Sequence, residues 1–242
     1  MVKISIVVPA FNEERLLGES LARIQSAATV FRQKNWEFEL IVCDNNSTDR
    51  TAEIARAAGA RVVFEPINQI ARARNSGAAA ATGDWLIFVD ADSHPGAELF
   101  SDVAEQIEIG RCVAGGSTAR FDEISLLPAF FIGLWNFSSR SFKLLAGSFI
   151  FVETAAFRKI GGFSHELFAA EELELTKRLK QLARETGRKI VILHRHPLVT
   201  SARKMHLYSA WEHIRLFSRV IFSQGRTLRD REEAHLWYDG RR

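Results

Sequence analysis

The first half of the chain alternates between short apolar runs and segments with the pattern of a helix. The apolar runs cover residues 4–9, 38–43, 61–65 and 85–89. Helical segments follow the first three runs, at about 13–31, at 47–59 with Ser47 or Thr48 as the cap, and at 71–81. This alternation is typical of parallel βαβ units. We therefore expect an α/β fold with a mostly parallel central sheet flanked by helices.

The second half is less regular. It predicts strands at 112–121, 147–152 and 189–193, a turn at 160–163, and an amphipathic helix at 171–183 with leucines on one face. No internal repeat, low-complexity tract or linker divides the sequence. We expect one domain over residues 1–205, followed by a C-terminal amphipathic helix and tail over 206–242.

Composition narrows the class of protein. Hydrophobic residues make up 47% of the chain and charged residues 25%, as in well-cored globular proteins. The net charge of +3 fits an anionic ligand or a membrane surface, but is too small to indicate nucleic acid. The two cysteines show no metal-binding spacing, and Cys43 lies in an apolar run, which predicts a buried thiol in a reducing cytosol.

Neither a signal peptide nor a membrane span is expected. The N-terminal residues lack a long apolar core and a small-residue cleavage site, and they read as a strand. The longest apolar stretch, 126–137, falls short of the roughly 20 residues that a spanning helix needs. We expect a cytoplasmic protein that can reach the inner face of the membrane.

Polar and acidic residues follow three of the predicted strands. The strand exits read PAFNE (9–13), DNNSTD (44–49) and DADSH (90–94). One polar exit is ordinary loop composition. However, parallel strands end at one edge of a sheet, where ligands of α/β proteins bind. Three such exits therefore indicate a site.

Asp90 and Asp92 pose an electrostatic problem where a buried strand leaves the core. Two carboxylates so close repel each other and disfavour full ionisation. A cation between them removes this penalty, and hard oxygen ligands suit Mg²⁺ or Mn²⁺. The DxD pattern therefore predicts a divalent metal site.

Several other site classes do not fit. The first strand is followed by neither G-x-G-x-x-G nor a P-loop, which disfavours a dehydrogenase or a P-loop enzyme. A phosphatase with a nucleophilic aspartate can carry D-x-D, but that motif would be expected on the first strand. Neither a Ser-His-Asp nor a zinc-protease signature is found.

Five motifs in order carry a family resemblance. They are VVPAFNE (7–13), IVCDNNSTDRT (41–51), ARARNSG (71–77), FVDAD (88–92) and GGF…EELEL…RL (161–179). In this order the chain resembles a family 2 glycosyltransferase of the glycosyltransferase-A fold over most of residues 4–180. The resemblance implies a nucleotide-binding half (1–110), an acceptor-side half (111–205) and inverting transfer by direct displacement. It also implies a nucleotide-sugar donor, with a UDP-sugar favoured, and Mn²⁺ or Mg²⁺ as cofactor.

The resemblance also implies roles for individual residues. Asp92 would bind the metal directly, and Asp90 would face the ribose or the metal. Asp44 would contact the base, where a carboxylate can accept an N–H. Of the basic pair on the third helix, Arg72 is expected nearer to the nucleotide than Arg74. The full set of expected nucleotide-binding residues is Pro9, Ala10, Asn12, Glu13, Asp44, Arg72, Arg74, Asp90 and Ala91.

Glu171 and Glu172 are the candidates for the catalytic base, which must take a proton from the acceptor hydroxyl. The family usually has Glu-Asp here, so the Glu-Glu pair departs from its pattern. Glu172 aligns with the family's aspartate and is our prediction for the base. Acidic residues also favour helix N-termini for structural reasons, and this simpler reading holds for Glu174.

Three further sequence features each allow two interpretations. His94 is a third metal contact or, as we favour, a solvated loop residue. Gly147, with Ser148, marks a close approach of backbone to the donor sugar or a simple turn. The residues Arg203, Lys204 and His206 close over the diphosphate or form a solvated basic turn.

Apolar material in two places bears on the acceptor. Residues 124–146 are rich in Phe, Leu and Trp near Arg140 and Lys143. An apolar stripe at helical spacing also occurs in the tail, at Leu207, Trp211, Ile214, Phe217 and Ile221 near Arg215 and Arg219. Such stripes usually pack on the core or on a second subunit of a homodimer. The more specific hypothesis is that they make a peripheral membrane contact near a lipid-linked acceptor. A saccharide is the other class of acceptor.

Two other functions stay open. A sugar nucleotidyltransferase should carry a Gly-rich basic loop after the first strand, where PAFNE stands instead. A non-catalytic, membrane-associated binding module would be expected to lose the metal acid or the base, yet Asp90, Asp92 and Glu172 are all present.

Overall fold

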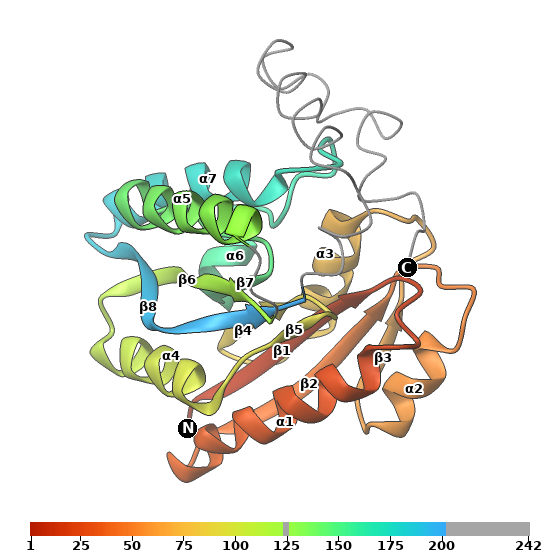
Figure 1. Cartoon of the computed structure of the whole chain (residues 1–242). Helices are drawn as coiled ribbons and strands as arrows, with labels where there is room; N and C mark the ends of the chain where they lie inside the picture. The colour runs from red at the N-terminus through yellow and green to blue at the C-terminus, as the bar shows by residue number, and fades with distance from the viewer. Residues whose placement is uncertain (123–125, 202–242) are drawn as a thin grey trace.

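An eight-stranded mixed sheet organises the chain in the computed structural model, which describes residues 1–122 and 126–201 (Figure 1). Its strand order is β3-β2-β1-β4-β7-β6-β8-β5. The first four strands are parallel neighbours, β7 runs antiparallel to β4 and β6, and β8 runs parallel to β6. The strands are β1 (Lys3–Ala10), β2 (Glu37–Asp44), β3 (Arg61–Phe64), β4 (Trp85–Val89), β5 (Ser93–His94), β6 (Cys112–Phe121), β7 (Phe149–Glu153) and β8 (Lys189–Thr200).

Helices cover both faces of this sheet and create two cores. One core packs α1 and α4 against the sheet through residues such as Leu21 and Phe100, and the other packs α3, α6 and α7 through residues such as Phe157 and Leu175. The helices are α1 (Leu17–Gln33), α2 (Thr51–Ala57), α3 (Ile70–Ala80), α4 (Ala97–Ile109), α5 (Leu126–Phe142), α6 (Thr154–Lys159) and α7 (Glu171–Glu185). The predicted α/β class is confirmed.

Coverage on both faces explains why the parallel strands are continuously apolar. Every residue of β4 is buried, as is every residue of β1 after Lys3. The register aligns the carboxyl ends, because Ala10 pairs with Asp44 and Asp44 pairs with Phe64. The exits of these strands therefore lie at one edge of the sheet, as predicted.

The boundaries differ from the sequence prediction in places where side chains make unexpected contacts. α2 begins at Thr51, because the hydroxyl of Ser47 and the backbone N–H of Thr48 bond to Asn12 and cap no helix. β8 continues to Thr200, because its second part pairs with the end of β6 and with β5. The helices α4, α5 and α6 were not predicted.

The fold also bears on the environment of Cys43 and on membrane-spanning helices. Cys43 is fully buried, as predicted. Across 1–122 and 126–201, none of the helices combines the length and apolar character that crossing a membrane requires.

Candidate active site

Asn12 joins the first two strand exits. Its backbone N–H donates to the Ser47 hydroxyl at 3.0 Å, and its Oδ1 accepts from the Thr48 N–H at 2.8 Å. The neighbouring Glu13 N–H donates to Thr51 Oγ1 at 2.8 Å. Asn12 has a positive φ of 52°, a conformation that asparagine tolerates better than most residues. The PAFNE segment is therefore fixed to the loop that follows β2.

Asp44 and Asn45 organise the next part of this edge. Asp44 is buried, and its Oδ1 accepts from the Ser47 N–H at 3.0 Å. Asn45 donates from Nδ2 to the Ile67 carbonyl at 2.6 Å and accepts at Oδ1 from the Gln69 N–H at 2.9 Å. Sequence reasoning assigned no role to Asn45. Its place directly after Asp44, inside the DNNSTD motif, was the signal available.

Arg74 is the centre of the site. Its side chain is 3% exposed and forms ion pairs with Asp90, at 2.9 Å, and with Glu171. The same guanidinium donates to the Gly147 carbonyl at 2.9 Å and lies over the Phe163 ring. One arginine of α3 thus joins the exit of β4, the entrance of β7 and the start of α7.

Three carboxyl groups lie around the Arg74 guanidinium. Burial alone would lower the pKa of the guanidinium, but the carboxylates of Asp90, Glu171 and Glu172 outweigh burial and raise that pKa above its usual value. Arg74 is therefore permanently charged. Its Nε is buried and has no hydrogen-bond partner among the described residues.

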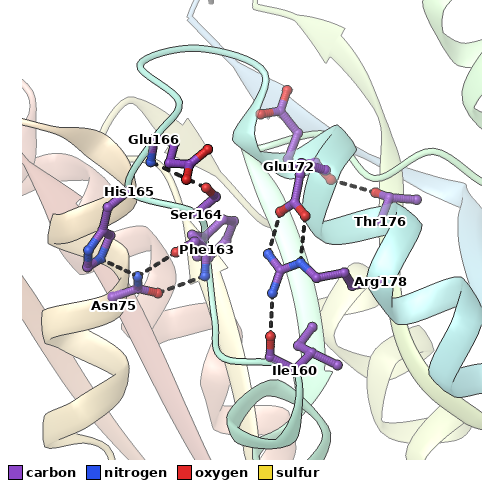
Figure 2. Close-up of polar contacts among 10 residues, drawn as sticks. Asn75, Ile160, Phe163, Ser164, His165, Glu166, Glu172, Thr176 and Arg178 are labelled. Carbon is purple, nitrogen blue, oxygen red and sulfur yellow. Dashed lines mark hydrogen bonds and ion pairs between the residues drawn. The ribbon is translucent and has the colours of Figure 1, made fainter. Parts of the chain in front are cut away.

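Glu171 and Glu172 have different environments although they are adjacent. Glu171 is buried and its carboxylate is held by Arg74. The Glu172 carboxylate has no hydrogen bond or ion pair with any residue in the described ranges, and Figure 2 shows it turned away from Arg178. Only the Glu172 carbonyl is bonded in this view, to the Thr176 hydroxyl at 2.6 Å.

The pKa of Glu172 is shifted strongly. Burial raises the pKa of this carboxyl, the charge of Glu171 raises it further, and Arg74 opposes both, which leaves the pKa at about 8. A raised carboxyl pKa near the working pH is typical of a general base or acid. Glu174, by contrast, pairs with Arg178 on the same helix, as its structural reading predicts.

The loop that leads into α7 is fixed from α3. Asn75 donates to the Phe163 carbonyl at 2.8 Å and accepts from its N–H at 2.9 Å (Figure 2). Gly162 has a φ of +70°, and a Cβ there would lie 2.6 Å from Asn75 Oδ1, so the close approach needs glycine. Gln69 adds hydrogen bonds to the carbonyls of His165 and Leu167. The position of Glu172 therefore depends on α3.

Of the predicted metal ligands, Asp92 is 4% exposed and Asp90 is paired with Arg74. Across 1–122 and 126–201, no three His, Cys, Asp or Glu side chains are grouped so that they could hold a metal ion. Mg²⁺ is commonly held by one or two carboxylates together with substrate phosphates. The carboxylate oxygens of Asp90 and Asp92 suit that arrangement, in which the phosphates of a bound substrate would complete the coordination.

His94 has contacts that the sequence did not predict. It lies on β5, is half-buried, and its Nε2 is 3.2 Å from the Ser20 hydroxyl of α1. Burial and the charge of Arg23 lower the pKa of this imidazole. His94 is therefore not the loop residue that we favoured, because it pairs with Val199 of β8 and contacts α1, which leaves its side chain half-buried.

Some of the remaining predicted residues lie within the described ranges, and others lie outside them. Arg72 donates to Gln69 Oε1 at 3.0 Å, while Pro9, Ala10 and Ala91 are buried at the strand ends. Ser148 accepts at its carbonyl from the Asp90 N–H at 3.2 Å. The predictions for Arg203, Lys204, His206 and the 206–242 helix lie outside the described residues.

Similar proteins were found at the levels of sequence and structure. A curated relative, undecaprenyl-phosphate 4-deoxy-4-formamido-L-arabinose transferase from Pseudomonas fluorescens, is 36% identical over 120 residues. The match covers 46% of this chain and 34% of that relative, so the chain spans about a third of the relative's length.

Two solved structures share the fold. A mannosyltransferase from Pyrobaculum calidifontis in complex with GDP-Man and Mn²⁺ aligns with a TM-score of 0.69 at 21% identity, over 88% of this chain and 60% of that one. The 1–349 fragment of S. aureus TarS in complex with UDP-GlcNAc aligns with a TM-score of 0.65 at 23% identity, over 97% and 69%.

The family assignment rests on a match to a family model over more than half of the chain. Residues 5–160 match the family described as Glycosyl transferase family 2. This range runs from within β1 to beyond β7 and includes the strand exits and Arg74. The chain therefore belongs to glycosyl transferase family 2.

Proposed function

We propose that the chain is a metal-dependent inverting glycosyltransferase that moves a sugar from a nucleoside diphosphate sugar to an acceptor hydroxyl. One observation carries the proposal. Arg74 links Asp90 at the exit of β4 to Glu171, which places the unpaired Glu172 carboxylate beside the DxD exit. Direct displacement requires a base for the acceptor hydroxyl and groups that bind the donor diphosphate, and this cluster supplies candidates for both.

Glu172 is the proposed base. The acceptor hydroxyl gives its proton to this carboxylate while its oxygen forms a bond to the anomeric carbon. The bond from that carbon to the diphosphate oxygen breaks, the electron pair leaves with the diphosphate, and the configuration inverts. Glu171 is a positioning residue, because its carboxylate is already held by Arg74.

The donor would lie along the edge formed by the β1, β2 and β4 exits. Asp44 is the proposed contact for the base, and Arg72 is the nearer of the two arginines because Arg74 is buried in its ion pairs. The solved structures of similar fold were obtained with GDP-Man or UDP-GlcNAc, which supports a nucleotide-sugar donor. Uridine is our first choice of nucleoside.

Asp92, with Asp90, would hold the divalent cation together with the donor diphosphate. A bound Mg²⁺ or Mn²⁺ neutralises charge that develops on the leaving diphosphate. The chain's own part is to supply carboxylate oxygens at the strand exit and to keep Asp90 oriented through Arg74. For the acceptor, the name of the Pseudomonas relative supports a lipid-linked molecule, and a saccharide is the other acceptor class.

Thermal stability with nucleotides tests the donor site. UDP, GDP, dTDP and CDP are each added with and without Mn²⁺ or Mg²⁺, because a ligand of the native state raises the melting temperature. We expect one nucleotide to raise it only with metal, and Asp92→Ala to abolish the rise. No rise with any nucleotide would contradict the proposal.

Turnover separates the transferase from its two rivals. Wild type should release nucleoside diphosphate from the donor, and Glu172→Gln should keep the thermal shift while losing release. A protein that binds nucleotide but never turns over would be a non-catalytic binding module. Release of pyrophosphate from a nucleoside triphosphate and a sugar 1-phosphate would instead identify a sugar nucleotidyltransferase.

A further inference from the structure

One arc of α5 exposes apolar side chains to solvent. Leu134 and Phe137 are 54% and 68% exposed, and Phe130 and Phe142 are exposed to a similar extent. Residues 130, 134 and 137 follow at intervals of four and three, so they lie on the same side of the helix. We call these three side chains, together with Phe142 at the last position of the helix, the α5 apolar arc. Exposed apolar patches of this kind mark interaction surfaces.

The other side of α5 is fixed to the protein. Asn136 accepts from the Ala119 N–H at 3.0 Å and donates to the Ala119 carbonyl at 2.8 Å, which ties the helix to β6. The Ser139 hydroxyl donates to the Leu144 carbonyl at 2.7 Å. Lys180 of α7 donates to the Phe142 carbonyl at 2.6 Å. The orientation of α5 is therefore set by these contacts, and the apolar arc faces outward.

On α5 and in the segment that follows it, the charge is of one sign. Residues 126–152 contain no Asp or Glu. Arg140 and Lys143 are exposed, and neither pairs with an acid among the described residues. Lys180 lies at the same end of the helix through its bond to Phe142. A partner for this surface must bury aromatic and aliphatic side chains while supplying negative charge.

We propose that the α5 apolar arc, with Arg140 and Lys143, is a docking surface for an anionic lipid bilayer. Amphipathic helices with Phe and Leu on one face and basic residues beside them lie in the interface of such membranes. α5 has 17 residues and is about 25 Å long, so it would lie on the bilayer rather than cross it.

The surface is close in sequence to the candidate active site. Lys143 is four residues before Gly147, whose carbonyl accepts from Arg74. Docking through α5 would hold this edge near the headgroups, which suits an acceptor anchored in the bilayer. The docking proposal itself stands on the exposed surface and its charge, and it does not require the proposed transferase reaction.

Vesicle co-sedimentation of the full chain, without nucleotide or metal, tests the proposal. The vesicles are phosphatidylcholine alone or phosphatidylcholine mixed with phosphatidylglycerol. We expect binding to the anionic vesicles, weakened by added salt. Arg140→Glu with Lys143→Glu should weaken it by about tenfold or more, because each basic residue near an anionic surface contributes several-fold. Leu134→Ser with Phe137→Ser should weaken binding to a similar degree.

Phe64→Ser is the matched control, since Phe64 is 60% exposed but lies at the end of β3, far along the sheet from β6. It should bind vesicles as wild type does. The melting temperature of each variant is measured to check that it is folded. Equal binding by the α5 variants and wild type would overturn the proposal, as would absence of vesicle binding. A change in oligomeric state on mutation of the arc, without vesicle binding, would assign the surface to a second copy.

Discussion

Arg74 and Glu171 form an ion pair between α3 and α7 in which both side chains are almost fully buried. The two residues are 97 positions apart in the chain, and the same guanidinium also holds Asp90. The acid of the DxD exit and the helix that carries the proposed base are thus oriented by one cation. The proposed donor and acceptor sides of the site are therefore linked through an arginine of α3.

The first prediction concerns the stability of this coupling. Arg74→Met leaves the Glu171 carboxylate buried without its partner, which should lower the free energy of unfolding by about 3–5 kcal/mol. Adding Glu171→Gln should restore most of that loss, because it removes the unpaired charge. Urea denaturation of the two single variants and the double variant measures this coupling. Arg23→Met breaks an exposed pair with Glu19 and should change stability by about 0.5 kcal/mol or less.

The second prediction separates the two glutamates by activity. Glu172→Gln should lower kcat by about 10²–10⁴-fold, because the amide cannot accept the acceptor's proton. Glu171→Gln keeps Glu172 intact and should cost far less in kcat. The measurement is nucleoside diphosphate release at saturating donor and acceptor. An equal loss in both variants would contradict the assignment of Glu172 as the base.

The pH dependence of the same variants gives an independent readout. A base must be ionised to act, so kcat/KM of the wild type should rise with pH and level off above about 8, the pKa of Glu172. Glu171→Gln removes a neighbouring negative charge that raises this pKa, so the rise should move to lower pH. If kcat/KM rises over the same pH range in both proteins, a group other than Glu172 controls the rise.

Much of the site edge could be predicted because it depends on local sequence. The DxD motif follows the buried strand β4, and the parallel register brings the exits of β1, β2 and β4 together. The bounds of β6 also match the prediction of 112–121. These features are determined by apolar runs and by the residues next to them.

The role of Arg74 could not be read from spacing. Its partners lie 16 and 97 residues away. They are brought to it only by the tertiary fold, in which α3 packs against β1 and β2, and β4 lies next to β1 in the sheet. A basic helix next to acidic exits was read as nucleotide-binding, whereas burial commits this arginine to protein carboxylates. α5 was missed because its apolar residues lie on the exposed side as well as on the side facing β6, which hides the helical period.

The third prediction uses the raised pKa of Glu172 as a stability measurement. A carboxyl whose pKa is about 8 in the folded state and near 4.5 when unfolded favours folding only while it is protonated. Its contribution is fully present below about pH 4.5 and is lost as the pH rises to about 8. Glu172→Gln stays neutral and should be more stable than the wild type above pH 8, by about 2 kcal/mol after its partial exposure is allowed for.

Chemical denaturation of both proteins at several pH values between 5 and 9 checks this difference. The advantage of Glu172→Gln should grow with pH and then become constant. A constant difference over the whole range would mean that the carboxyl is not perturbed by folding. A charged Glu172 would lower the stability of the folded protein, and such a cost is expected where a charge is needed for function.

The last prediction concerns Gly147, where the backbone passes close to the Arg74 guanidinium. A Cβ at Gly147 would lie 3.0 Å from Arg74 Nη2 and 3.4 Å from Nη1. Two carboxylates hold this guanidinium, so it cannot move away without weakening its pairs with Asp90 and Glu171. Gly147→Ala should therefore lower the free energy of unfolding by about 1–3 kcal/mol and lower kcat more than it changes the KM for the donor.

Gly18→Ala is the matched control for this substitution. Gly18 lies in the first turn of α1, where an added Cβ would meet Ile54 at an ordinary contact distance of 3.5 Å. Because alanine favours a helix over glycine, this variant should be as stable as the wild type or more stable by up to about 1 kcal/mol, with unchanged kcat. Denaturation and turnover are measured for both variants. If Gly147→Ala behaves like Gly18→Ala, the guanidinium has room to move, and the position of Arg74 is not the feature that orients Asp90 and α7.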